Sequence, residues 1–214
     1  MVQEWTRTIN HRLYRLDEHL KRLYMSLKVA GIDPGMSITE MERITLEVLE
    51  SNISTVQADD DVWMIQEVSP GLAPGYGLKF TREYHGPTVL IFCIPLVYVD
   101  PSDYSNGVHV VITNTRNLPP ECCDPKIKHN SRLFMKQADR EAKMIDPKAW
   151  ALMLDLYGNV TEIADGANFF IVKDGIVRTS SSRDVLQGIA RKTALEIARE
   201  LSIPAIEEDF QAYD

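Results

Sequence analysis

Over Leu16–Ala30, apolar residues return every three or four positions, which predicts an amphipathic helix that ends near Gly31. A second helix is predicted to follow. Thr39 and Glu42 have the spacing of a capping box, and apolar residues continue at helical intervals to about Asn52. Both helices are expected to pack their apolar faces against a core.

The middle of the chain contains strand-like segments that are separated by turn-forming residues. Four strands are predicted there: Val62–Val68, Leu78–Tyr84, Val89–Val97 and Val108–Asn114. Because they follow one another through turns, they predict an antiparallel sheet. Helices and strands come in blocks rather than in strict alternation, which favours the α+β class.

Paired prolines mark the best candidate for a boundary between two lobes. The segment from Leu118-Pro119-Pro120 to Asp124-Pro125 is expected to be extended, because a residue before proline avoids the helical conformation. We therefore predict an N-terminal α+β lobe at 1–117, a linker at 118–130 and a C-terminal lobe at 131–214. The elements predicted after the linker are a helix at about Ser131–Met144, strands near Ala151–Asp155, Ala167–Val172 and Ile176–Thr179, an Asp174-Gly175 hairpin turn between the last two, and a final helix at Arg191–Leu201.

Composition and charge narrow the range of partners. A chain of 214 residues with 44% hydrophobic and 25% charged residues is expected to fold without disulfides or metals. Its net charge of −8 argues against nucleic acid or an anionic membrane as the main partner, which leaves small molecules. The three cysteines lack the spacing of a zinc site, so no metal is expected. No apolar run resembles a signal peptide or a membrane span, and a cytoplasmic location is predicted.

Two local features carry candidate chemistry. Lys128 lies at the end of the linker, where a ligand cleft between lobes is expected, and lysine is the residue that forms Schiff bases. Most lysines are solvated surface charges, which is the competing interpretation. Gly188 precedes a predicted helix start at which the backbone N–H groups of Ile189 and Ala190 would attract an anion, although an ordinary helix start has the same pattern.

Three stretches in order resemble the class IV aminotransferases, which are pyridoxal-phosphate (PLP) enzymes of fold type IV, and the resemblance covers the whole chain. The first is Arg15–Leu23, similar to the opening helix of the family. The second is Asp124–Lys128, followed by Arg132-Leu133 and Glu141-Ala142. The third comprises Gly158–Glu162, Asn168–Gly175 and Leu186–Arg191.

The resemblance implies a role for each of five residues. Lys128 would carry PLP as a Schiff base and move the proton between the substrate Cα and the cofactor. Glu162 would lie against the pyridine nitrogen and keep it protonated. Arg22 would bind the phosphate with its planar fork of donors, and Ile189 and Ala190 would add backbone N–H groups. Residues 131–214 would then form a PLP-binding lobe.

A second lysine competes for the Schiff base. Lys126 stands four residues before Asn130, a spacing often found in branched-chain aminotransferases. Lys128 is preferred because the thirteen-residue step from Lys128 to Glu141 agrees without a gap with the pattern of the D-amino acid transaminases.

Departures from the family pattern limit what the resemblance implies. Ala190 replaces the usual threonine, so PLP binding is expected to be weaker, and one extra residue separates Glu162 from Asn168. Gln3 replaces an aromatic residue, and no Arg-x-His pair follows Arg82, which argues against a specialist for D-amino acids. The chain begins inside the first long strand of the family pattern and ends before its last strands. Both the first N-terminal strands and the C-terminal segment are therefore expected to be absent, with strand edges exposed.

The implied function is transfer of an amino group between an amino acid or amine and a 2-oxo acid, in a homodimer. One alternative is a lyase similar to aminodeoxychorismate lyase, whose lysine region resembles Lys128-His129-Asn130-Ser131-Arg132-Leu133. Another alternative, from a different class, is a non-catalytic protein that binds PLP or another protein.

Overall fold

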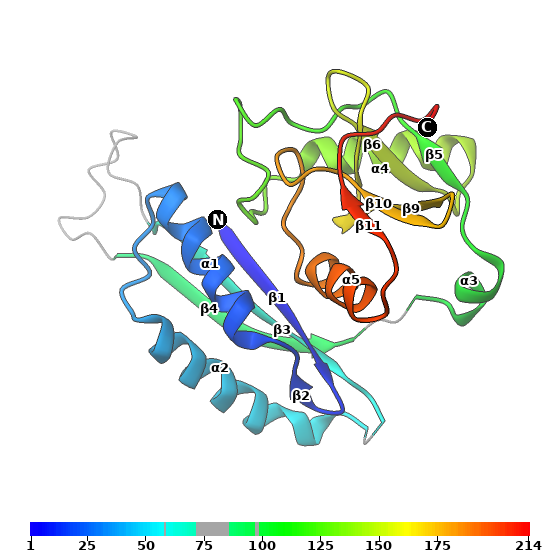
Figure 1. Cartoon of the computed structure of the whole chain (residues 1–214). Coiled ribbons are helices and arrows are strands. Elements are labelled where there is room, and N and C mark those ends of the chain that lie inside the picture. Colours follow the sequence, from blue (N-terminus) through cyan, green and yellow to red (C-terminus); the bar gives the residue numbers. More distant parts are fainter. Residues whose placement is uncertain (58, 72–85, 97–98) are drawn as a thin grey trace. The chain divides into compact units, whose positions relative to one another are not determined.

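The structure is a computed structural model that describes residues 1–57, 59–71, 86–96 and 99–214, and its contacts divide the chain into two compact units (Figure 1). Unit 1 comprises Met1–Tyr98 and Ile127–Ser131, and unit 2 comprises Val99–Lys126 and Arg132–Asp214. The predicted linker at 118–130 is thus shared between the units, and residues 99–117 belong to unit 2 rather than to the N-terminal lobe.

Unit 1 is a four-stranded antiparallel sheet with two helices on one face (Figure 1). The strand order is β2-β1-β3-β4. Its elements are β1 (Val2–Ile9), β2 (Arg12–Leu13), α1 (Leu16–Ala30), α2 (Ile38–Asn52), the 3₁₀ turn η1 (Ile53–Thr55), β3 (Val62–Ser69) and β4 (Thr88–Pro95). The predicted strand Leu78–Tyr84 lies outside the described residues.

The first helix confirms its prediction, and the second begins differently from its prediction. Leu20 and Leu23 of α1 are fully buried against the sheet, and the helix ends at Gly31, whose φ of +67° suits glycine. For α2, the cap is Ser37 and not Thr39, because the Ser37 hydroxyl accepts a hydrogen bond from the backbone N–H of Glu40.

Unit 2 contains two sheets and three helices in the described part of the chain. One sheet has the order β5-β6-β7-β8 and the other β11-β10-β9. The elements are α3 (Pro101–Asn106), β5 (Val110–Ile112), α4 (Leu133–Ile145), β6 (Trp150–Leu154), β7 (Val160–Ile163), β8 (Ala167–Asn168), β9 (Phe170–Lys173), β10 (Ile176–Thr179), α5 (Ile189–Glu200) and β11 (Ala205–Glu207).

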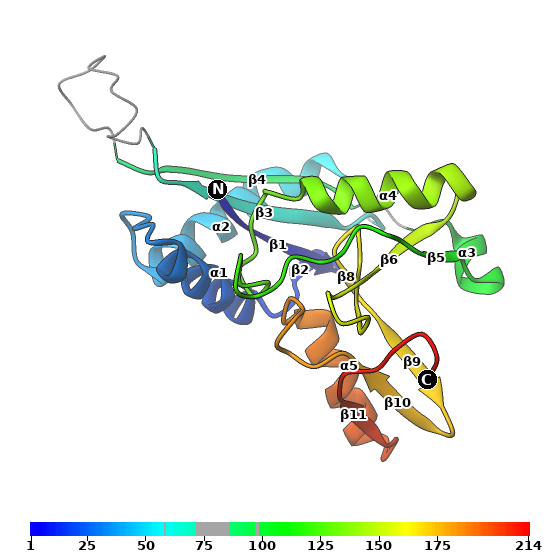
Figure 2. The same ribbon diagram turned by 90° about the horizontal axis from the view of Figure 1, so that it is seen from above.

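The expectation that Val108–Asn114 continues an antiparallel sheet with the earlier strands is wrong. β5 pairs in parallel with β6, in a different sheet from β3 and β4. Parallel neighbours need a crossover connection, and α4 provides it by packing along both strands through Met135, Ala138 and Ala142 (Figure 2).

The hairpin turn after β9 confirms its prediction. Asp174 and Gly175 have φ values of +52° and +75°, as a two-residue turn with two left-handed positions requires. The strand predicted at Ala167–Val172 is divided into β8 and β9, which belong to different sheets. None of the helices in the described ranges is long and apolar enough to cross a membrane.

Candidate active-site residues

Lys128 is fixed through its main chain between a strand and a helix of unit 1. Its carbonyl oxygen accepts a hydrogen bond from the Gln3 N–H of β1 at 2.9 Å, and its own N–H donates to the Ser26 hydroxyl of α1 at 3.3 Å. His129 forms an antiparallel bridge with Val2. The lysine therefore stands in an anchored segment, although its side chain is only half-buried.

Lys126, the competing lysine, is held differently. Its Nζ lies 2.8 Å from the Asp124 carboxylate, and its backbone N–H donates to the same carboxylate. Burial raises the pKa of Asp124, and the hydrogen bonds and charge of Lys126 outweigh it, so the pKa falls below its usual value. The charge of Lys126 thus stabilises its own turn in unit 2.

Arg22 is paired with a buried carboxylate. Its Nε donates to Oε2 of Glu4 at 2.9 Å and its Nη2 donates to Oε1 at 2.6 Å, and His19 Nδ1 lies 3.0 Å from the same Oε1. Glu4 is fully buried, while the Arg22 side chain is 13% exposed. Burial opposes ionisation of Glu4, but the hydrogen bonds from His19 and Arg22 prevail and lower its pKa to about 2.

In unit 1, the backbone of Lys128 and the Glu4–Arg22 pair are both attached to β1 and α1. Gln3, which bonds to Lys128, precedes Glu4 on β1. Ser26, which also bonds to Lys128, follows Arg22 by about one turn of α1, on the same face of the helix.

Glu4 and His19 were missed by the sequence analysis. A signal was available, because Glu4 lies on the same face of the predicted strand as Val2 and Thr6, and a carboxylate on a buried face needs partners. His19 and Arg22 lie three residues apart on α1 and can reach one carboxylate together.

In unit 2, the Glu162 carboxylate is buried beside the start of α5. Glu162 is 3% exposed, and its Oε1 accepts hydrogen bonds from the Leu186 N–H at 2.8 Å and from Asn168 Nδ2 at 3.1 Å. Asn168 Nδ2 also donates to the Leu186 carbonyl at 2.8 Å. The carboxylate is thus tied to the loop that leads into α5.

The helix start that follows has no side-chain cap. α5 begins at Ile189, its N-cap is Gly188, and Ala190 is exposed. The backbone N–H groups in the first turn of a helix have no partner within it, so they suit an anion. A Cβ at Gly188 would overlap the side-chain oxygen of Asn168, which explains the glycine and brings the residue that holds Glu162 against the helix start.

Gly188→Ala is expected to lower the free energy of unfolding by about 1–3 kcal/mol, because the added methyl group displaces Asn168 from Glu162 and Leu186. Urea unfolding measures the change. In an Asn168→Ala background the same substitution should cost less, since the overlapping oxygen is gone. Equal costs in both backgrounds would contradict the close approach.

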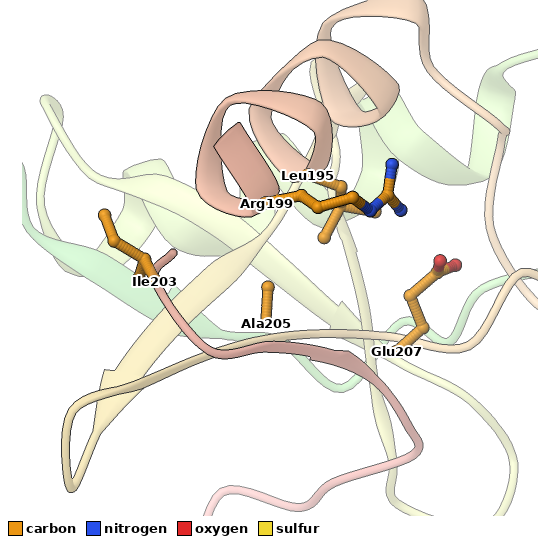
Figure 3. A pocket seen from close by; sticks show the side chains of 5 residues that line it. All are labelled: Leu195, Arg199, Ile203, Ala205 and Glu207. Atoms are coloured by element: carbon orange, nitrogen blue, oxygen red, sulfur yellow. The ribbon is translucent and has the colours of Figure 1, made fainter. Parts of the chain in front are cut away.

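Unit 2 also has a hollow that is lined by none of the candidate residues described above. Its lining residues come from α5, β11 and the segment between them: Leu195, Arg199, Ile203, Ala205 and Glu207 (Figure 3). It holds about 240 Å³, below the roughly 300–1,000 Å³ of typical small-molecule sites. None of the five residues implied by the resemblance lines it.

The residue types fit PLP. The cofactor has a phosphate, for which a guanidinium and a helix start are suitable, an aldehyde that reacts with an amine, and a pyridine nitrogen that a buried carboxylate keeps protonated. Residues of these types occur in each unit taken by itself: Arg22 and Lys128 in unit 1, and Glu162 and the start of α5 in unit 2.

The fold and these residue types are compatible with fold type IV of the PLP-dependent enzymes. The sequence model of the family Amino-transferase class IV matches residues 1–214, and the chain belongs to this family. The chain is 29% identical over 214 residues to a Methanocaldococcus jannaschii protein provisionally named a branched-chain-amino-acid aminotransferase, and it covers 70% of that protein.

Solved structures confirm the predicted fold class. The branched-chain aminotransferase of Thermoproteus uzoniensis, crystallised with norvaline, superposes with a TM-score of 0.79 at 25% identity, over 99% of this chain and 69% of that chain. An aminotransferase from Brucella abortus, bound to PLP, has a TM-score of 0.84 at 22% identity, over 100% of this chain and 72% of that chain. This chain therefore spans about 70% of the length of these proteins.

Proposed function

We propose that this protein is a PLP-dependent aminotransferase that moves an amino group between an amino acid or amine and a 2-oxo acid, with Lys128 as the lysine bonded to the cofactor. The cofactor is PLP, as the family implies. The observation that carries the assignment of Lys128 is its backbone anchor on β1 and α1, the two elements that also hold the Glu4–Arg22 pair.

When bound, PLP supplies an electron sink for the negative charge that develops at the substrate Cα. The protein supplies the proton transfers and the orientation. The Lys128 amine would take the proton from the substrate Cα and return it during the transfer. The Glu162 carboxylate would keep the pyridine nitrogen protonated. Arg22, and the N–H groups of Ile189 and Ala190, are the donors that would bind the phosphate.

The names of the relatives favour a branched-chain or similar apolar amino acid as the amino donor. We further propose a cytoplasmic homodimer, as expected for the family. An assay with leucine and a 2-oxo acid tests the reaction by the new oxo acid that forms. Release of pyruvate from an amino-deoxy substrate without oxo-acid exchange would favour the lyase, and bound PLP without either product would favour the non-catalytic alternative.

Borohydride reduction of the PLP-loaded protein is expected to fix the cofactor to Lys128, because the reductant converts the bond between the lysine amine and the aldehyde into a stable amine. Peptide mapping by mass spectrometry identifies the labelled residue. Lys126→Ala should still be labelled and Lys128→Ala should not. A label on Lys126 would overturn the assignment.

A further inference from the structure

We propose that Glu4 and His19 are positioning residues that hold the Arg22 guanidinium in the orientation in which it binds the phosphate of PLP. This inference rests on the proposed function. It assigns a role to two residues for which the family resemblance implied none, and it follows from the geometry of one buried cluster.

Two hydrogen bonds to Glu4 fix the plane of the Arg22 guanidinium. Nε and Nη2 of Arg22 donate to separate oxygens of Glu4, at 2.9 and 2.6 Å, which is the two-point geometry that arginine forms with a carboxylate. An arginine side chain loses substantial rotamer entropy when it becomes ordered. Glu4 already orders Arg22 in the protein without ligand. Binding of a phosphate therefore loses less of this rotamer entropy than binding to a mobile arginine would.

The Glu4 carboxylate is itself held in place by several donors. Its Oε1 accepts hydrogen bonds from the Trp5 N–H at 2.9 Å, from Arg22, and from His19 at 3.0 Å. The donors come from both β1 and α1, and the carboxylate has no exposed surface. The Glu4 side chain therefore cannot rotate without breaking several hydrogen bonds. His19 contributes one of them from α1, to Oε1 of the carboxylate.

The orientation of Arg22 and its charge have opposite expected effects on phosphate binding when Glu4 is neutralised. Glu4 carries a full negative charge near neutral pH, so Glu4 and Arg22 form a pair with no net charge. If charge alone mattered, loss of the Glu4 charge would strengthen phosphate binding, since Glu4 would no longer offset the positive charge of Arg22. If orientation matters, the same loss weakens binding. The two accounts predict opposite signs.

The test is a set of PLP titrations on the full chain at one salt concentration. Arg22→Ala is expected to weaken PLP binding by roughly ten-fold to over a hundred-fold, the effect of losing a hydrogen bond to a charged group. Glu4→Gln is expected to weaken it on the order of ten-fold. The double variant should bind no more weakly than Arg22→Ala alone, because Glu4 acts only through Arg22.

His19 provides a second route that keeps the carboxylate in place. His19→Asn retains a donor near the position of Nδ1 and should preserve PLP affinity, whereas His19→Phe removes the donor and should weaken binding a few-fold. The ³¹P resonance of bound PLP should shift in Glu4→Gln and in His19→Phe, and it should stay in place in His19→Asn. Unfolding curves of the PLP-free proteins report separately whether each variant folds.

The outcomes separate this inference from the proposed function. Unchanged affinity in Arg22→Ala would remove Arg22 from the phosphate site and would count against the proposed function. A weakened Arg22→Ala together with a Glu4→Gln that binds equally or more tightly would overturn only the positioning role. An additive double variant would overturn it as well. If Glu4→Gln does not fold, the comparison of His19→Phe with His19→Asn decides.

Discussion

Lys128→Ala is expected to reduce the rate of transamination by at least 10²- to 10⁴-fold, the usual range for loss of one proton-transfer group. The loss should lie at the upper end, because in the proposed mechanism the same amine both carries the cofactor and moves the proton at the substrate Cα. Single-turnover reaction of the PLP-loaded protein with leucine, followed by absorbance of the cofactor, measures the step directly.

Lys126→Ala is the matched control for this prediction. The two lysines lie two residues apart, but the Lys126 amine pairs with Asp124. Its removal should leave the rate within a few-fold of the parent and weaken only a local turn. If Lys126→Ala is inactive and Lys128→Ala is active, the Schiff-base lysine is Lys126 and the spacing argument fails.

Glu162→Gln is expected to leave PLP bound and to slow abstraction of the substrate proton by on the order of 10²-fold or more. If Glu162 has the proposed role, a neutral amide in its place would no longer keep the pyridine nitrogen protonated, so the cofactor ring would accept negative charge less well. The amide oxygen of glutamine can still accept a hydrogen bond from the Leu186 N–H, so the loop before α5 should keep its place.

The substrate deuterated at Cα gives a second readout for Glu162. Its isotope effect should increase if proton abstraction becomes rate-limiting in the variant. Glu200→Gln, at an exposed position near the end of α5, is the control and should behave as the parent does. Turnover of Glu162→Gln equal to that of the parent would remove Glu162 from the reaction.

Local signals predicted the elements well. The bounds of α1 follow from its apolar spacing and from Gly31, and the Asp174-Gly175 hairpin follows from two residues that tolerate positive φ. The start of α2 was misplaced because Ser37, two residues before the predicted cap, offers an equally good hydroxyl.

These local signals did not predict which strands pair with one another when the strands are far apart in the sequence. The parallel partner of β5 lies about forty residues away in β6, and local periodicity does not encode a partner at that separation. The same limit applied to the candidate site. The sequence indicated Arg22 only through the family resemblance, whereas Lys128 also stood out by its position at the end of the linker. The contacts of Gln3 with Lys128 and of Glu4 with Arg22 join a strand to segments that are distant in sequence, and no local pattern predicts them.

The chain passes from one unit to the other after Tyr98, returns at Ile127 and leaves again after Ser131. Unit 1 is consequently discontinuous, and its last five residues, which include Lys128, are made after the first part of unit 2. During synthesis, the partner that Lys128 provides for the Gln3 N–H of β1 is therefore made late, and most of unit 1 leaves the ribosome before Lys128 does. A gene fragment that encodes residues 1–98 would specify the scaffold of Arg22 without the segment that completes it.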